Sequence, residues 1–136
     1  MPKGTFQLRR RFGIWSAKAF ADSVSVEGPA RTIYLAGMGA EDTETGEIRH
    51  PGDLVAQARY SYEKIKAALA KEGATMENVV KITTYVTDGA FLKDYSRCRI
   101  EAFGDAPLSP HTFVVVQRLA WPDMLVEVDV TAVVPV

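Results

Sequence analysis

Two residues near the C-terminal end of the chain have side chains suited to acid–base chemistry. His111 follows a proline in the segment SPHTFVVVQR (109–118), at the start of a run that otherwise resembles a buried strand, and the chain has only one other histidine. Glu127 interrupts the apolar alternation of VEVDVTAVV. A neutral imidazole can shuttle a proton near pH 7, and a carboxylate can activate water. On residue type alone both also have ordinary explanations: a histidine bonded to a backbone carbonyl, and an acid in an ion pair between subunits.

Other reactive residue types give weaker indications. Asp129, two residues after Glu127, could form a paired-carboxylate site, although an ion pair between subunits is the commoner arrangement. Cys98 is the only cysteine, which excludes an intrachain disulfide and a thiolate zinc site, and we expect a buried, inert thiol. The acids of the polar segment 40–53 lack the glycine-centred spacing of a calcium loop; they are Glu41, Asp42, Glu44 and Glu47. The sequence therefore predicts no metal site.

A basic run near the N-terminus is the only pattern that favours nucleic acid. The segment LRRRFG (8–13) has aromatic neighbours, and such a combination can bind RNA through phosphate contacts and base stacking. Three arginines are few, and the first residues of a chain often form a solvated arm. RNA binding or endoribonuclease activity is therefore the least favoured of the functions considered.

Composition indicates an ordinary globular protein. The 136 residues, of which 47% are hydrophobic and 24% charged, are enough for one domain with a packed core, predicted over 1–136. The net charge of −1 provides no overall field toward nucleic acid or an anionic membrane. No apolar run is long enough to span a membrane, and the N-terminus has no secretory pattern. With a single cysteine, this predicts a cytoplasmic protein.

The elements that must position these residues follow from hydrophobic periodicity and turn signals. Asp53 is a plausible N-cap for a long amphipathic helix over 54–73, and Asp88 for a second helix over about 89–103. A turn at Gly28-Pro29-Ala30 joins two β-rich runs and predicts a hairpin. The order is β-β-α-β-α-β-β, and a further short strand before residue 10 is compatible with it. The predicted strands are 22–28, 31–37, 78–87, 111–119 and 125–134.

The last strand indicates how the sheet is covered. One side of its alternation is apolar, and the other carries Glu127, Asp129 and Thr131. The run TFVVV (112–116) is apolar on both faces. This predicts an α+β fold with two helices on one face of the sheet and self-association through the other face.

The motifs YLAGMGAEDTETGEI, ALAKEGATMENVVKITTYVTD, RIEAF and SPHTFVVVQRL…VEVDVTAVV together resemble the YjgF family, also called the reactive-intermediate deaminase (Rid) or L-PSP endoribonuclease-like family. The resemblance covers about residues 15–134. It implies a chorismate-mutase-like fold assembled as a homotrimer, with clefts at the subunit interfaces. Deaminating members hydrolyse enamines or imines there, without metal or cofactor, and release ammonia and a keto acid.

The resemblance also assigns site residues, and here the chain departs from the family. Glu127 matches the family's glutamate, but His111 occupies the position of the arginine that clamps the substrate carboxylate. Histidine cannot replace that arginine, because imidazole lacks the bidentate fork of guanidinium. With a looser alignment, Phe20 stands at a tyrosine position and Arg97 at an asparagine position. Arg97 or Arg118 could act as a displaced clamp.

These expectations together give one favoured function and one rival. The favoured function is a hydrolase or deaminase that acts on an imine, enamine or related nitrogenous metabolite between subunits, distinct from the standard 2-iminoacid deaminase. In it, Glu127 organises water and His111 replaces the clamp with a neutral or switchable contact tuned by Glu127. The rival is a trimer that binds a metabolite or acts as a scaffold without turnover.

Overall fold

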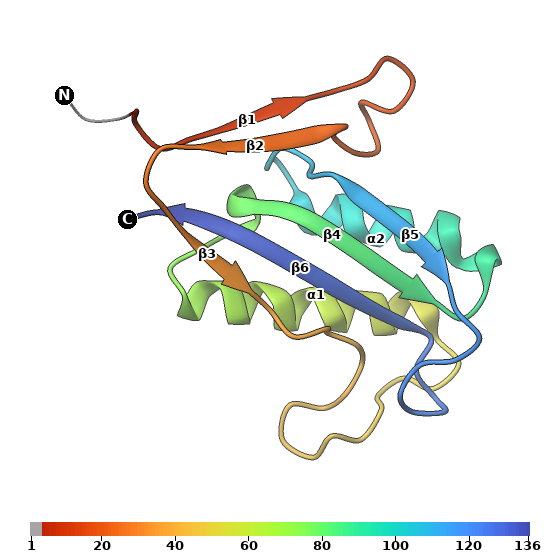
Figure 1. The fold of residues 1–136 in the computed structure, drawn as a ribbon. Coiled ribbons are helices and arrows are strands. Elements are labelled where there is room, and N and C mark those ends of the chain that lie inside the picture. Colours follow the sequence, from red (N-terminus) through yellow and green to blue (C-terminus); the bar gives the residue numbers. More distant parts are fainter. Residues whose placement is uncertain (1–3) are drawn as a thin grey trace.

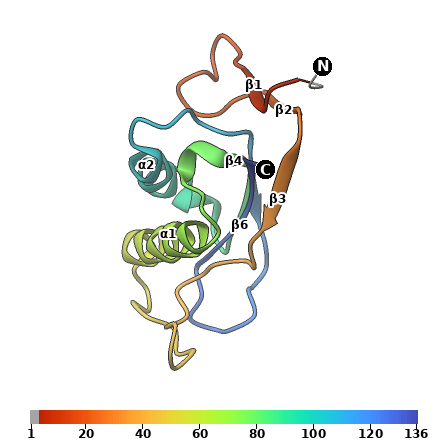
Figure 2. The same cartoon turned by 90° about the vertical axis from the view of Figure 1, so that its left-hand side faces the viewer.

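Two helices pack on one face of a four-stranded sheet, as Figure 1 and Figure 2 show. The computed structural model describes residues 4–136; residues 1–3 of the predicted domain lie outside the described part. The sheet has the strand order β3-β6-β4-β5, and β1 and β2 form a separate two-stranded ribbon. The architecture is the predicted α+β arrangement. Its elements are β1 (Gln7–Arg11), β2 (Ser23–Glu27), β3 (Ala30–Tyr34), α1 (Leu54–Lys71), β4 (Val79–Val86), α2 (Leu92–Phe103), β5 (His111–Val115) and β6 (Val126–Pro135).

The helix boundaries follow the predicted capping residues closely. The Asp53 carboxylate accepts a hydrogen bond from the amide of Ala56 at 3.0 Å and so caps α1, which ends before Gly73 with its φ of 75°. Asp88 also caps, but the element that it caps is a 3₁₀ turn, Gly89–Phe91, and α2 begins only at Leu92.

Strand β6 lies in the middle of the sheet and carries its apolar residues toward the helices. It pairs antiparallel with β3 on one side and with β4 on the other. The predicted alternation is confirmed, because these side chains belong to the buried core: Val126, Val128, Val130, Ala132 and Val134. Glu127, Asp129 and Thr131 occupy the opposite face.

The predicted hairpin at Gly28-Pro29-Ala30 is wrong. Strand β2 pairs with β1, the short strand before residue 10, and β3 pairs with β6. Gly28 has a φ of 84°, and a Cβ there would lie 2.7 Å from the carbonyl oxygen of Thr5, so the chain turns a tight corner. The two strands that flank this corner therefore belong to different sheets.

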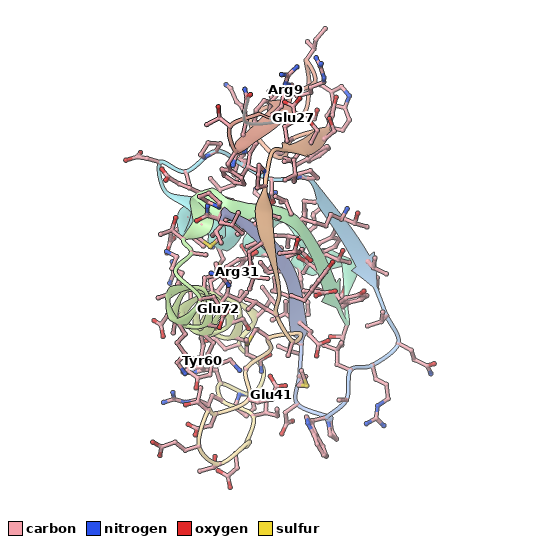
Figure 3. The ribbon with its side chains drawn as sticks, turned by 60° about the vertical axis from the view of Figure 1, so that its left-hand side comes forward. Arg9, Glu27, Arg31, Glu41, Tyr60 and Glu72 are labelled. Carbon is pink, nitrogen blue, oxygen red and sulfur yellow. The ribbon has the colours of Figure 1, made fainter. Side chains whose placement is uncertain are left out.

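Ion pairs join these peripheral strands to their neighbours. Arg9 and Glu27 pair across the ribbon at 3.0 Å, and Arg31 of β3 reaches Glu72 at the end of α1 at 3.1 Å (Figure 3). Each side chain remains about half exposed, so each pair contributes about 0–1 kcal/mol. They orient β3 and the ribbon more than they stabilise them.

The second face of the main sheet is not covered by either helix, as Figure 2 shows. Cross-strand register places Tyr85 opposite Glu127 and Thr83 opposite Asp129 on this face, and Tyr34 of β3 is strongly exposed on it. In the described part of the chain, no helix is long and apolar enough to cross a membrane.

Candidate functional site

A pocket of about 350 Å³ lies at the β5 edge of the sheet. Three segments far apart in the sequence form it: the chain before β2, the helix α2, and β5. It brings together two of the sequence-predicted site residues, Phe20 and His111. Its polar lining consists of Ser96, Arg99 and His111, and its larger apolar side chains are Phe20, Leu92 and Phe113.

His111 begins β5 and points toward the helices. Its Cα lies opposite that of the buried Ile82 in the parallel β4–β5 pair, so both side chains share the helix-facing side of the sheet. The imidazole Nε2 lies 2.9 Å from the hydroxyl of Thr84. The ring stacks on Tyr95, with 6.0 Å between centroids, and meets Phe113 edge-on. His111 is therefore fixed on three sides.

A chain of hydroxyl groups extends from His111 through the core. Thr84 donates to the hydroxyl of Tyr95 at 2.5 Å, and that hydroxyl lies 2.6 Å from the hydroxyl of Tyr62 on α1. Burial raises the pKa of both phenols, so they remain neutral hydrogen-bonding groups. This series of hydrogen bonds connects β5, β4, α2 and α1 directly behind the pocket.

His111 is neutral at pH 7. Burial lowers its pKa to about 3, and the positive charges of Arg99 and Lys81 act in the same direction. Glu127 is not among the groups that act on it. Within one chain, the expected tuning of His111 by Glu127 therefore does not occur.

This pKa predicts a specific loss of stability in acid. As the pH falls from about 6.5 toward 3, the unfolded chain protonates His111 and the folded chain does not, so the folding equilibrium constant should fall about tenfold per pH unit through this group alone. Urea unfolding at pH 6.5 and pH 4.5 measures the effect. His111→Asn is the matched control, and the loss between the two pH values should be clearly smaller in it. Equal losses would contradict a depressed pKa.

Glu127 lies on the other face of the sheet, packed against a glycine. A Cβ at Gly37 would be 2.6 Å from the carboxylate Oε2, so only glycine leaves room for Glu127 as it is placed. Burial raises the pKa of Glu127, and the negative charges of Glu41 and Asp129 raise it further. A raised pKa makes the carboxylate a stronger base, which suits a group that accepts a proton from water. The structure does not bring Glu127 and His111 together within one chain.

The two arginines predicted as displaced clamps lie outside the pocket lining. Arg97 is exposed and pairs with Asp94 at 3.3 Å. Arg118 is exposed and donates to the carbonyl oxygens of Leu119 and Ala120.

Sequence reasoning missed Arg99, which lines the pocket and is only 2% exposed. Within residues 4–136, its Nε and Nη1 have no hydrogen-bond partner. The available signal was helical spacing: Arg99 lies one turn after Tyr95 and one turn before Phe103, on the apolar side of α2.

The basic run does not form one surface. Strand alternation separates Arg10 from its two neighbours, and Arg10 donates to the carbonyl oxygen of Glu77 at 2.7 Å. Arg9 is paired with Glu27. Across residues 4–136, no group of three or more His, Cys, Asp or Glu is arranged to hold a metal ion.

Comparisons with known proteins agree on one family. The family described as endoribonuclease L-PSP matches residues 14–134. A RutC family protein of Pyrococcus abyssi is 37% identical over 74% of this chain and 76% of its own length. The 2-iminobutanoate/2-iminopropanoate deaminase of Escherichia coli is 32% identical over 74% and 78%. A Rid-family protein of unknown function from Yersinia pestis superposes with a TM-score of 0.83, with 27% identity over 96% of this chain and 100% of that one.

Proposed function

The chain belongs to the YjgF/Rid family, and from this premise we propose that it is a deaminase-type hydrolase of an imine, enamine or related nitrogenous metabolite. The observation that carries the proposal is the pocket at the β5 edge. It joins Phe20 and His111, which stand at positions that the family resemblance marks as functional, and adds the buried Arg99. The relative named as an iminobutanoate and iminopropanoate deaminase supports the reaction class.

The reaction needs a water-activating group, and we assign that role to Glu127. Glu127 lies on the uncovered face of the sheet and the pocket lies at its helix-facing edge, so this role requires that a second copy of the chain supply the carboxylate. The homotrimer that the family resemblance implies is the assembly that we propose for this purpose. Glu127 would take a proton from water as the oxygen attacks the imine carbon. It would return that proton to nitrogen, which gives a carbinolamine. It would then move the proton of the new hydroxyl group to the same nitrogen, so that the C–N bond breaks, ammonia leaves and a carbonyl compound remains. Neutral His111 contributes a hydrogen bond instead of a charge.

The direct test is hydrolysis of freshly generated 2-aminoacrylate, followed by ammonia release, in the natural protein and in His111→Arg. We expect turnover in the natural protein, so that the expected difference from the standard 2-iminoacid deaminases lies in the residue that holds the substrate and not in the bond that is hydrolysed. We expect less in the variant, because arginine removes the contact with Thr84 and adds a second cation beside Arg99. If the natural protein does not hydrolyse 2-aminoacrylate but His111→Arg does, the natural protein has a different ligand. If neither protein hydrolyses 2-aminoacrylate, and the fold and assembly of both are intact, the result would favour the non-catalytic metabolite binder.

A further inference from the structure

We infer that Arg99 binds the carboxylate of the pocket's ligand, so that anion recognition comes from helix α2. The inference rests on the proposed function only in placing the ligand in this pocket. The role falls to a residue that neither the family resemblance nor the spacing of charges identifies.

Among the residues that the structure describes, Arg99 is a buried cation without a charged partner, and such a group destabilises the folded chain. Guanidinium stays charged in proteins, and leaving a buried charged group without a partner costs several kcal/mol. Burial lowers the pKa of Arg99, which reflects this cost; the phenols of Tyr62 and Tyr95 act in the opposite direction, but no carboxylate of the described residues does. By contrast, several other arginines pair with an acid; they are Arg9, Arg31, Arg49, Arg59 and Arg97. An arrangement of this kind is stable when an anion occupies the pocket.

Arg99 is the charged side chain of the pocket lining. Its lining contains no aspartate or glutamate. His111 is neutral, and the phenols of Tyr62 and Tyr95 behind it keep their protons. Arg99 therefore gives the pocket one positive charge, which matches a monoanion.

The shape of the guanidinium group and the polarity of the pocket wall also suit a carboxylate ligand. The planar fork of guanidinium suits the two oxygens of a carboxylate, and the remaining wall is largely apolar, with Phe20, Leu92 and Phe113. A dianionic phosphate would lack a second cation in this lining. The ligand class is thus a small carboxylate with an apolar substituent.

The experiment measures binding without turnover. The probe is 2-oxobutanoate, compared with its uncharged amide and with inorganic phosphate. Trp15 meets Phe20 edge-on at 5.8 Å between centroids and provides a fluorescence signal at the pocket, with Trp121→Phe as the background. We expect 2-oxobutanoate to bind more tightly than the amide and phosphate. Arg99→Met should raise the Kd for 2-oxobutanoate at least tenfold. Arg97→Met is the matched control, two residues earlier on the same helix, and should change this Kd by less than twofold.

Thermal unfolding without ligand separates a binding role from a structural one. If Arg99 is an unpaired cation kept for a ligand, Arg99→Met should keep or raise the Tm, because a buried charge gives way to an apolar side chain. Added 2-oxobutanoate should raise the Tm of the natural protein and not that of the variant. Arg99→Lys should bind weakly, since it keeps the charge and loses the fork.

The inference would be overturned by no binding of 2-oxobutanoate to the natural protein, by equal binding of the amide, or by unchanged binding in Arg99→Met. Tighter binding of phosphate would also overturn the carboxylate assignment. Carboxylate binding that depends on Arg99, without hydrolysis of 2-aminoacrylate, would leave the inference standing and reject the proposed function. The two failures are therefore distinguishable.

Discussion

Replacing Glu127 with glutamine should reduce turnover of 2-aminoacrylate by about 100-fold or more, the range expected for loss of a general base. Glutamine preserves the size of the side chain against Gly37 but cannot accept a proton from water. Asp129→Asn is the control for loss of a negative charge on the same face and strand; because the charge of Asp129 raises the pKa of Glu127, this variant should shift the pH profile of turnover without a comparable fall in the maximal rate. Binding of 2-oxobutanoate should change little in Glu127→Gln. Full activity in that variant would remove Glu127 from the mechanism.

Mixing two inactive variants tests whether one site draws on two chains. Glu127→Gln retains an intact pocket, and Arg99→Met retains the carboxylate at position 127. If the pocket and Glu127 come from different copies, subunits exchanged by mild unfolding and refolding should regain a fraction of the activity. Light scattering shows whether each sample has the same assembly. Mixed assemblies without any recovery of activity would mean that Glu127 and the pocket do not meet across an interface.

The second large effect is expected on stability, at Gln57 in α1. Its side chain is fully buried and bridges two loops: Nε2 donates to the carbonyl oxygen of Asp123 at 2.9 Å, and Oε1 accepts from the amide of Leu125 at 2.9 Å. Nε2 also lies 3.2 Å from the carbonyl oxygens of Arg49 and His50. Gln57→Leu keeps the volume and leaves these backbone groups without their partner.

We expect Gln57→Leu to lower the free energy of unfolding by about 2–4 kcal/mol, because each buried polar group left unsatisfied costs about 1–3 kcal/mol and the loop carbonyls regain some water. Urea unfolding monitored by circular dichroism measures it. Gln117→Leu, on an exposed loop residue, is the control and should stay within about 0.5 kcal/mol. A loss below 1 kcal/mol for Gln57→Leu would show that the loops hold their positions without it.

The sequence predicted the elements well because their signals are local. Caps such as Asp53 and the alternation of β6 act over a few residues and survive in the structure. Strand pairing is not local: the partner of β3 is β6, at the far end of the chain, and no pattern near Gly28 records it. The hairpin was the natural but incorrect choice.

The candidate site was predicted only in part, for two physical reasons. The face on which a strand residue lies depends on register, and the pairing of His111 with Ile82 and of Glu127 with Tyr85 places the two residues on opposite sides. Whether a helix arginine is buried depends on helical phase, so Arg97 and Arg99, two positions apart, have opposite surroundings. The family resemblance pointed to His111 and Phe20, but it did not mark Arg99, the buried arginine that lines the pocket from α2.

The contacts of His111 restrict how this chain could have diverged from relatives with arginine in its place. An arginine at position 111 would set a second guanidinium beside Arg99, and the two like charges would repel in a pocket without acids. It would also leave the Thr84 hydroxyl without its imidazole partner. If Arg99 binds the ligand carboxylate as inferred, a clamp on the strand and a clamp on the helix should therefore work against each other. An exchange of the two arginines by single substitutions would pass through a chain with both cations or with neither, so we expect the two substitutions to be epistatic.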